Sequence, residues 1–533
     1  MTHDVVICGA GPAGSVVAQR LAAAGLRVAL VGGAARPGWE GLSSRSRGLL
    51  MEEGVDSRGD VIAGPWVRRG AWANGRSVEG VEWLVERARL ANVLSACARE
   101  RGADYRAGTA SGAMRAGDCW RVALRGGEVL RAPMVVDARG RSARGSWALS
   151  SRREAHPLQR NESPDPESPR EGLRRSGPVL LAIGQEFRRR GEGAWGTGIG
   201  VTDLGWCWWA ERGDALWVQI IGKPRSLRPA VWAAAAAAQI PALARVLEGA
   251  CAVGAPVARA AHAQLGDAHR AGGVRFGDEN RSLVRAAHAK DGGARADDGA
   301  EPTFWPAGDA AMALDPLSGQ GVYEAVRGAR LVATAIQSVW AGGDARVAQR
   351  FVAERREEAW LHGVSVAAGF YRENESRGGF WSETAAAYEA LLTERAAIDG
   401  LSAEGGPASK GESRANALRR PARAGAAWIE RRPVLDEGRI VEREVVVSAE
   451  HPRGVWQVAG VPLAALRAHL EAVEHANVDA VEHTGVDAVE HTVVEAAAVA
   501  LDRTPGAVAS AMNWLRERGP LSQRGLPRVS SGG

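Results

Sequence analysis

Residues 4–31 read DVVICGAGPAGSVVAQRLAAAGLRVALV, and this stretch decides the fold. The apolar run Val5–Cys8 predicts a buried strand, and Gly9–Gly14 is a glycine-rich turn. A helix is expected over Ser15–Ala24 and a second strand over Arg27–Val31. A strand, a GxGxxG turn, a helix and a further strand form the βαβ unit that binds dinucleotides. The sequence therefore predicts a Rossmann-like domain at its N-terminal end.

Each glycine of the turn has a separate purpose. Gly9 permits the tight turn, Gly11 lets the backbone approach a pyrophosphate, and Gly14 lets the helix pack closely on the strand. The N-terminus of the expected helix follows the turn residues Pro12 and Ala13, and its unpaired N–H groups and positive dipole end favour phosphate. These five positions are the predicted pyrophosphate site.

One part of the dinucleotide pattern is missing. An acidic residue that binds the ribose hydroxyls is expected about twenty residues after the turn, at the end of the second strand. Here that place reads Val31-Gly32-Gly33, and the nearest acid is Glu40. Recognition of the adenosine is therefore assigned to Glu40 or to backbone groups.

Composition excludes several classes of protein. The chain has 533 residues, 45% of them hydrophobic and 24% charged, which is ordinary for a globular protein of about three domains. Arginines alternate with acids and form no basic block, so no nucleic-acid partner is expected. No apolar run is long enough for a membrane span, and the first strand begins at Asp4, without room for a signal peptide. These two observations lead us to expect a cytoplasmic location. The five cysteines include no CxxC pair, so neither a metal site nor a disulfide framework is predicted.

Two further motifs follow the glycine-rich turn. The first is Val135-Val136-Asp137-Ala138-Arg139-Gly140-Arg141, and the second is Gly308-Asp309-Ala310-Ala311 followed by Asp315-Pro316-Leu317-Ser318-Gly319-Gln320-Gly321. In this order and spacing, the three motifs resemble the superfamily of FAD-dependent aromatic hydroxylases, flavin-dependent halogenases and geranylgeranyl reductases. The resemblance covers roughly residues 1–345.

The resemblance implies that FAD, not NAD, occupies the first motif. It implies that Asp309 holds the ribityl hydroxyls and that the helix after Ser318 points its N-terminus at the flavin pyrimidine, where a reduced flavin carries negative charge. Arg87 matches a superfamily arginine near the cofactor, although a surface position on its helix is the alternative. The residues that the resemblance adds to the predicted FAD site are Arg87, Asp137, Gly308, Asp309, Pro316, Gly319, Gln320 and Gly321.

Tryptophan is concentrated in one predicted strand, Gly205-Trp206-Cys207-Trp208-Trp209-Ala210. The chain has 19 tryptophans and only six phenylalanines. One interpretation is an aromatic substrate wall beside the flavin, made by Trp206, Trp208, Trp209 and Trp305. The other is a tryptophan-rich core, and the two are compatible.

Sequence features separate the branches of the superfamily. Halogenases need an early lysine, whereas the first lysine here is Lys223, so halogenation is not expected. Hydroxylases of small phenols usually carry a histidine where this chain has Met312. The DPLSGQG string and the GWxWWA strand look most like flavoproteins that mature tryptophylquinone cofactors of quinoprotein oxidases and amine dehydrogenases. In that subgroup the substrate is a tryptophan side chain of another polypeptide.

The expected function is an FAD-dependent monooxygenase that hydroxylates a tryptophan or another aromatic group, in a partner protein during quinone cofactor maturation. Alternatives are an FAD-dependent reductase or dehydrogenase of a small or prenyl substrate, and a non-catalytic flavoprotein. The sequence has no second nucleotide motif, so electrons are expected from NAD(P)H that docks transiently or from a separate flavin reductase. No catalytic acid or base is assigned.

The predicted fold class is α/β, with a Rossmann-like FAD-binding domain, an inserted mixed β-sheet domain for the substrate and a small C-terminal α+β, winged-helix-like domain. An eight-residue repeat carries His475, His483 and His491, which do not share a helix face and so predict no metal site. The predicted ranges are 1–177 and 255–345 for the FAD domain with an insertion at 151–176, 178–254 for the sheet domain, 346–398 for a helical segment, 399–437 for a linker and 438–533 for the C-terminal domain.

Overall fold

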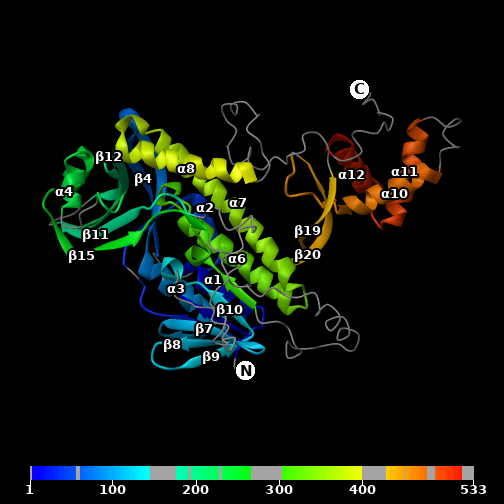
Figure 1. Ribbon diagram of the computed structural model, residues 1–533, viewed down its shortest axis with the longest axis horizontal. Helices are drawn as coiled ribbons and strands as arrows, with labels where there is room; N and C mark the ends of the chain where they lie inside the picture. The colour runs from blue at the N-terminus through cyan, green and yellow to red at the C-terminus, as the bar shows by residue number, and fades with distance from the viewer. Residues whose placement is uncertain are drawn as a thin grey trace, which may run out of the picture. The chain divides into compact units, whose positions relative to one another are not determined.

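The computed structural model describes residues 3–35, 37–55, 61–143, 176–189, 194–226, 231–265, 303–398, 428–448, 450–476 and 486–518. The chain forms two compact units, and each is described by itself. The first comprises Met1–Ala345 and Val352–Glu394, and the second Arg346–Phe351 and Arg395–Gly533. Within the described ranges, no helix is both long and apolar enough to cross a membrane. The predicted α/β class is confirmed (Figure 1).

A parallel sheet forms the base of the first unit. Its strands lie in the order β17-β10-β1-β2-β6, and every neighbouring pair is parallel. The helix α1 (Pro12–Ala23) connects the first two strands in sequence and begins at Pro12, because proline suits the first helical position. The strands are β1 (Val5–Cys8), β2 (Val28–Gly32), β6 (Asp104–Ala107), β10 (Met134–Asp137) and β17 (Thr303–Pro306).

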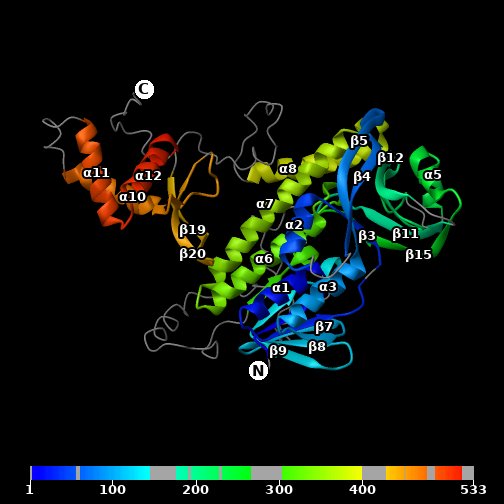
Figure 2. The same ribbon diagram turned by 180° about the vertical axis from the view of Figure 1, so that it is seen from behind.

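The two faces of this sheet are covered differently (Figure 2). Side chains alternate along a strand, so Val6 and Cys8 share one face, where they pack with Trp120 and Val122 of a three-stranded sheet. That sheet consists of β7 (Ala110–Ala116), β8 (Cys119–Leu124) and β9 (Val129–Ala132). The helix α1 packs against α3 (Arg87–Glu100) and α6 (Gly321–Trp340) and contacts β1 and β2.

A second sheet of eight strands has the order β15-β11-β14-β13-β12-β4-β5-β3. Three of its eight strands come from residues 39–86, within the predicted FAD domain 1–177, and β15 crosses the predicted boundary at 254. The sheet therefore extends beyond the predicted range 178–254. The strands are β3 (Trp39–Leu42), β4 (Ile62–Trp72), β5 (Arg76–Glu86), β11 (Leu181–Arg189), β12 (Trp195–Thr202), β13 (Gly205–Arg212), β14 (Ala215–Gly222) and β15 (Ala250–Ala260).

Helices complete the first unit. The short helices α4 (Trp232–Ala237) and α5 (Pro241–Leu247) pack on one face of the eight-stranded sheet. The predicted helical segment corresponds to α7 (Ala345–Arg372) and α8 (Gly379–Ile398). Residues 144–175, which contain most of the predicted insertion, lie outside the described residues.

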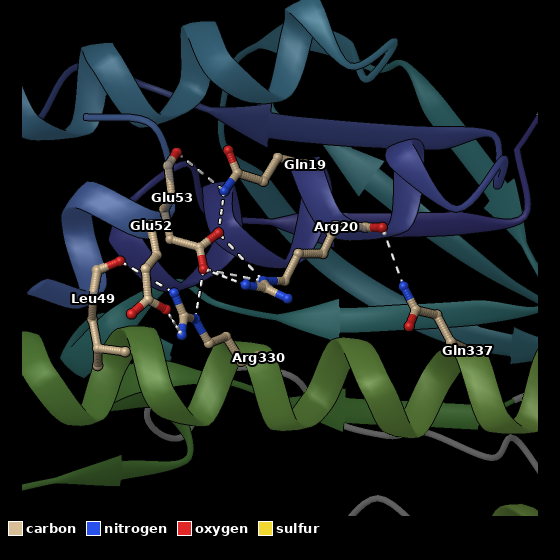
Figure 3. Close-up of polar contacts among 7 residues, drawn as sticks. All are labelled: Gln19, Arg20, Leu49, Glu52, Glu53, Arg330 and Gln337. Atoms are coloured by element: carbon tan, nitrogen blue, oxygen red, sulfur yellow. Dashed lines mark hydrogen bonds and ion pairs between the residues drawn. The ribbon is translucent and has the colours of Figure 1, made fainter. Parts of the chain in front are cut away.

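A buried carboxylate joins three helices of the first unit (Figure 3). Glu53 follows α2 (Ser44–Glu52), and its side chain is 2% exposed. Its Oε1 accepts hydrogen bonds from Arg20 Nη2 of α1 and from Arg330 Nε of α6, both at 2.6 Å. Gln19 of α1 donates to the same carboxylate. One side chain therefore fixes α1, α2 and α6 together, in the C-terminal half of α1.

The second unit is an α+β module. A hairpin of β19 (Trp428–Asp436) and β20 (Arg439–Val447) precedes β21 (Gln457–Val458), β22 (Val461–Pro462), α10 (Leu463–Ala476), α11 (Val486–Ala500) and α12 (Pro505–Arg518). The three helices share a core with Val446 of the hairpin. The predicted linker 399–437 was too long, because its last residues form β19. The winged-helix comparison remains a prediction; His483 lies outside the described residues, and His475 and His491 fall on α10 and α11.

Candidate functional site

The glycine-rich turn is closed at two positions and open at one. Gly9 has a φ of 113°, and its N–H donates to Val31 O at 2.7 Å. A Cβ at Gly9 would lie 2.3 Å from Ala138 O, and a Cβ at Gly14 would lie 1.8 Å from Gly9 O. No atom lies within 4 Å of a Cβ built at Gly11, and no side chain caps α1 there. The backbone at Gly11 is therefore exposed at an uncapped helix N-terminus, with Pro12 and Ala13 next in the chain.

Asp309 lies against this turn. It belongs to the short 3-10 helix Gly308–Ala310, and a Cβ on Gly308 would lie 2.7 Å from the Ala13 Cβ. Arg141 Nε donates to Asp309 Oδ2 at 3.1 Å, and the same guanidinium donates to two backbone carbonyls. Asp309 Oδ1 has no hydrogen bond to the described residues and its side chain is part-exposed, so this oxygen is available to a ligand.

Two other predicted site residues, Glu40 and Arg87, form an ion pair. The Arg87 backbone N–H also donates to Gly38 O at 2.9 Å, which ties the start of α3 to the segment before β3. Burial raises the pKa of Glu40 and the negative charge of Asp309 raises it further, whereas Arg87 lowers it. Glu40, Arg87 and Asp309 therefore lie in one electrostatic neighbourhood, although they come from distant parts of the sequence.

The position of the missing acid has no room for a side chain. A Cβ built at Gly32 would lie 2.2 Å from the Ala10 Cβ of the glycine-rich turn. Any larger residue would displace that turn, which explains why no acid stands at the end of β2. Glu40 is the acidic residue nearest to Gly32 along the chain. It pairs with Arg87 and lies close enough to Asp309 to be affected by its charge.

Asp137, a predicted site residue, pairs with Arg139. Its side chain is buried, and its two oxygens accept from Arg139 Nε and Nη2, each at 2.9 Å. The Arg139 backbone N–H also donates to Asp137 Oδ1. Asp137 thus orients Arg139 immediately after β10.

The loop before α6 is a second open backbone segment. Pro316 begins a short 3-10 helix that ends at Gly319, which has a φ of 63°; Gln320 then precedes Gly321, the first residue of α6. No atom lies within 4 Å of a Cβ built at Gly319 or Gly321. A planar ligand could therefore approach the backbone here, at the N-terminus of a long helix.

A buried hydrogen-bond network around Asp315 fixes the conformation of this loop. Asp315 caps the loop by accepting the Leu317 N–H at 2.9 Å, and its Oδ2 accepts the hydroxyls of Tyr371 at 3.1 Å and Tyr388 at 2.7 Å. Burial raises the pKa of Asp315, and it raises the pKa of both phenols, so these tyrosines stay protonated and act as donors. Two of the four tyrosines in the chain thus converge on one carboxylate. No local sequence signal indicates this convergence, because Tyr371 and Tyr388 lie 56 and 73 residues beyond Asp315.

The tryptophan-rich strand β13 divides its side chains between two faces. Trp206 and Trp208 share one face: Trp206 Nε1 donates to Tyr371 Oη at 3.4 Å, and Trp208 Nε1 donates to Glu82 Oε2 at 3.3 Å. Trp209 lies on the opposite face, in the apolar core beneath α4 and α5. Trp305 is buried in the parallel sheet, where it donates to Thr303. The structure therefore brings together Trp206 and Trp208 and separates Trp209 and Trp305 from them.

The face that carries Trp206 and Trp208 contacts the support of the second open segment and the stretch that precedes Glu40. Trp206 reaches the Asp315 loop through Tyr371. Trp217 of β14 lies on the same face, and a Cβ built on Gly38 would be 3.1 Å from its Cζ2 atom. Gly38 accepts the hydrogen bond from Arg87, so Trp217 reaches the Glu40–Arg87 pair. We call this surface of the eight-stranded sheet the inner face.

Comparison with known proteins agrees with this geometry. A family model described as lycopene cyclase protein matches residues 4–160. The peptidyl tryptophan dihydroxylase QhpG, essential for tryptophylquinone cofactor biogenesis, superposes with a TM-score of 0.64 at 23% identity, covering 97% of this chain and 100% of that chain. The flavin-dependent halogenase CmlS superposes with a TM-score of 0.57 at 18% identity, covering 98% of this chain and 96% of that chain. The likeness to these two solved structures shows that the chain has their fold.

Another solved structure with this fold is the myxobacterial chondrochloren halogenase CndH, with a TM-score of 0.51 at 19% identity, covering 75% of this chain and 91% of that chain. No curated protein sequence matches the chain. The glycine-rich turn follows the carboxyl end of β1 in the parallel sheet, where ligands bind in open α/β sheets. The second open segment lies further along the chain, after β17 and the short strand β18 (Met312–Ala313).

The residues present fit FAD, the cofactor that the sequence motifs imply. The open backbone at Gly11 and the uncapped start of α1 suit a pyrophosphate, and Asp309 offers a free carboxylate oxygen to a ribityl hydroxyl. The open Gly319–Gly321 backbone suits an isoalloxazine edge. Arg141 was not predicted as a site residue, although it lies in the quoted Asp137–Arg141 motif; its partner Asp309 is 168 residues away.

Proposed function

We propose that this chain is an FAD-dependent monooxygenase of an aromatic substrate. The observation that carries the proposal is the inner face, a surface built from Trp206, Trp208 and Trp217 that is linked through Tyr371 to the loop before α6. When bound, FAD would supply the redox chemistry that activates dioxygen. The chain's own residues would bind and orient the cofactor and the aromatic ring and exclude water from between them.

The reaction balances with an external reductant. One atom of dioxygen enters the ring in place of a ring hydrogen and the other leaves as water, while NAD(P)H or a reduced partner flavoprotein supplies two electrons. Both donors remain open, because the sequence carries no second nucleotide motif. Arginines and carboxylates occur in pairs around the FAD segments, and no group there is assigned as a catalytic acid or base.

We further propose that the substrate is a tryptophan residue in a partner protein that acquires a quinone cofactor. The support is the likeness to a peptidyl tryptophan dihydroxylase over almost the whole of both chains, including the C-terminal region. A protein substrate also gives the second unit a purpose, since a flavin pocket alone cannot select one side chain within a polypeptide.

A second candidate function is a flavoprotein that uses no oxygen, such as a reductase or dehydrogenase of a prenyl substrate. The match of residues 4–160 to a lycopene cyclase model favours it, because that name refers to an isoprenoid substrate. The inner face, lined with indoles that donate hydrogen bonds to Glu82 and Tyr371, fits an aromatic ring better than a hydrocarbon chain.

Purified protein decides between these functions. Its visible spectrum and the FAD released by heat test the cofactor. The reduced protein is then mixed with oxygen, a tryptophan-containing peptide and, in a parallel sample, halide. A mass gain of one or two oxygen atoms on the peptide supports the proposal. A halogenated peptide, a reduced prenyl compound without oxygen uptake, or colourless protein contradicts it.

Asp309→Ala should weaken FAD binding. A buried ribityl hydroxyl would lose a charged acceptor, which is worth about 1.5–3 kcal/mol, or roughly ten- to a hundredfold in Kd. Arg141 keeps its two carbonyl acceptors, so the variant should still fold. Quenching of flavin fluorescence measures the Kd. The control Asp309→Asn retains an acceptor oxygen and should lose less affinity; equal Kd values for all three proteins would refute the assignment.

Removal of the second unit should leave FAD bound and abolish binding of the protein substrate. The deletion begins before Trp428, because β19 pairs with β20 along its whole length and a cut at 438 would leave half a hairpin. The measurement is a pull-down of the substrate protein that the hydroxylation assay identifies, with full-length and shortened chains. Equal recovery of that protein, or loss of FAD from the shortened chain, would indicate a stabilising cap instead.

A further inference from the structure

The inner face contains buried polar atoms that have no hydrogen-bond partner. The register places Arg68, Thr197, Ala210 and Trp217 in one row across β4, β12, β13 and β14. Residues directly opposite one another on neighbouring strands project to the same face. Within this row, Thr197 Oγ1 and Trp217 Nε1 are both buried and unpartnered among the described residues. Buried polar groups are nearly always hydrogen-bonded, so these two atoms point to a group that the chain itself does not supply.

Two further atoms extend this pattern. Trp66 lies opposite Glu82 in the β4–β5 pair, and its buried Nε1 has no partner. Arg259 of β15 lies opposite Ala182, which lies opposite Ile221, which in turn lies opposite Trp206, so Arg259 projects to the same face as Trp206. The buried Nη1 of Arg259 has no partner either. All four unpartnered atoms therefore belong to the inner face. Three are nitrogen donors that cannot accept a hydrogen bond, and the fourth is a hydroxyl that can donate.

The inner face has an exposed part and a buried part. In the exposed part, Trp195 lies two residues before Thr197 on β12 and pairs with Arg212 of β13. Trp195 is 49% exposed and stacks on Trp66 with ring centroids 5.1 Å apart, while the Arg212 guanidinium lies 5.7 Å from the Trp195 ring centroid. In the buried part, Trp217 lies against Gly38, whose carbonyl accepts the Arg87 backbone N–H. An aromatic ligand that enters past Trp195 would thus meet stacking surfaces first and hydrogen-bond donors further in.

We propose that the inner face binds an aromatic ring that carries hydrogen-bond-accepting oxygens close to it, and that Trp66, Thr197 and Trp217 donate to those oxygens. The proposal rests on the proposed function and names its substrate class. Two sources share this chemistry: the peptide carbonyls on either side of a tryptophan residue, and the carboxylate of a free aromatic acid. A bare hydrocarbon ring offers no acceptor and would leave the donors unpaired, at a cost in affinity.

The test measures binding to the oxidised, FAD-loaded protein without reductant, so that no turnover occurs. Isothermal calorimetry compares N-acetyltryptophanamide, which has two carbonyls, indole-3-propionate, which has a carboxylate, and 3-methylindole, which has neither. At least one of the first two probes should bind about tenfold or more tightly than 3-methylindole, and whichever binds more tightly identifies the source of the acceptor.

Variants then assign the donors. Thr197→Val and Trp217→Phe each remove one donor and keep nearly the same shape. Each variant should raise the Kd of the oxygen-bearing probe about two- to tenfold, as expected for the loss of one hydrogen bond, and should change the Kd of 3-methylindole less than twofold. Trp209→Phe is the matched control, since it removes an indole N–H from the opposite face of β13.

A purely structural role gives a different result. Thr197→Val removes a buried hydroxyl that lacks a partner, so the unliganded variant should melt no lower than the wild type. The proposal is overturned if the variants lower the affinity for all probes equally or if the wild type binds all probes with the same affinity. It is also overturned if no probe binds, or if the variants lose affinity for FAD instead. Because binding is read without turnover, these outcomes are separate from failure of the hydroxylation assay, which would count against the proposed function.

Discussion

Gly11→Val is expected to give a folded protein that no longer retains FAD. Gly11 has a φ of −73° and a ψ of −178°, an extended conformation that valine adopts readily, and no atom lies within 4 Å of a Cβ built there. The substitution therefore strains neither the backbone nor the packing of the protein itself. Its side chain would occupy the space through which a pyrophosphate approaches the backbone, so we expect a loss in FAD affinity of roughly a hundredfold or more, about 2.8 kcal/mol.

The measurement is the flavin content of the purified variant, followed by titration with FAD. Gly112→Val is the matched control, because Gly112 of β7 also has open space around its Cβ position and lies in a strand far along the chain from the turn. The control should bind FAD like the wild type. Wild-type flavin occupancy in Gly11→Val would refute the pyrophosphate assignment, and a collapsed circular dichroism spectrum would contradict the claim that the turn tolerates the side chain.

The local elements around the turn were predictable from sequence, because their signals are local. The strand Val5–Cys8 has the predicted bounds, and α1 begins three residues earlier than predicted, at Pro12. The stretch 83–100 has the apolar spacing of one helix, but its first residues belong to β5 and the helix begins at Arg87. Leu84 and Val85 are both buried although they alternate along the strand, and such short apolar runs do not distinguish a strand from a helix.

The candidate site was only partly predictable, because it depends on long-range contacts. Sequence motifs indicate the glycines and Asp309. Glu40 and Arg87 form an ion pair only because β3 pairs with β5, which brings the two residues together. Trp206, Trp208 and Trp209 are equivalent in the sequence, and the pleat alone places Trp209 in a core. Tyr371 and Trp217 carry no motif, so the polar support of the inner face could not be foreseen.

Glu53→Ala is expected to destabilise the first unit by about 3–5 kcal/mol, the usual cost of removing one partner from a buried ion pair. The carboxylate accepts from Arg20, Arg330 and Gln19, so its loss leaves three donors of α1 and α6 without their shared acceptor (Figure 3). Thermal and denaturant unfolding, monitored by the fluorescence of the tryptophans, measure the effect.

Glu52→Ala is the matched control for Glu53→Ala, because the neighbouring carboxylate binds the same arginine: Glu52 Oε2 accepts from Arg330 Nη1 at 2.6 Å. The side chain of Glu52 is 64% exposed, however, and an exposed ion pair contributes only about 0–1 kcal/mol. The two variants therefore remove the same charge from adjacent positions and differ only in burial. A large loss of unfolding free energy in Glu53→Ala and a small loss in Glu52→Ala would show that the buried carboxylate holds α1, α2 and α6 together. Equal losses would mean that net charge, rather than desolvation and shared donors, sets the stability. Since α1 and α6 begin at the two open backbone segments, Glu53→Ala should also weaken FAD binding, while Glu52→Ala should leave it unchanged.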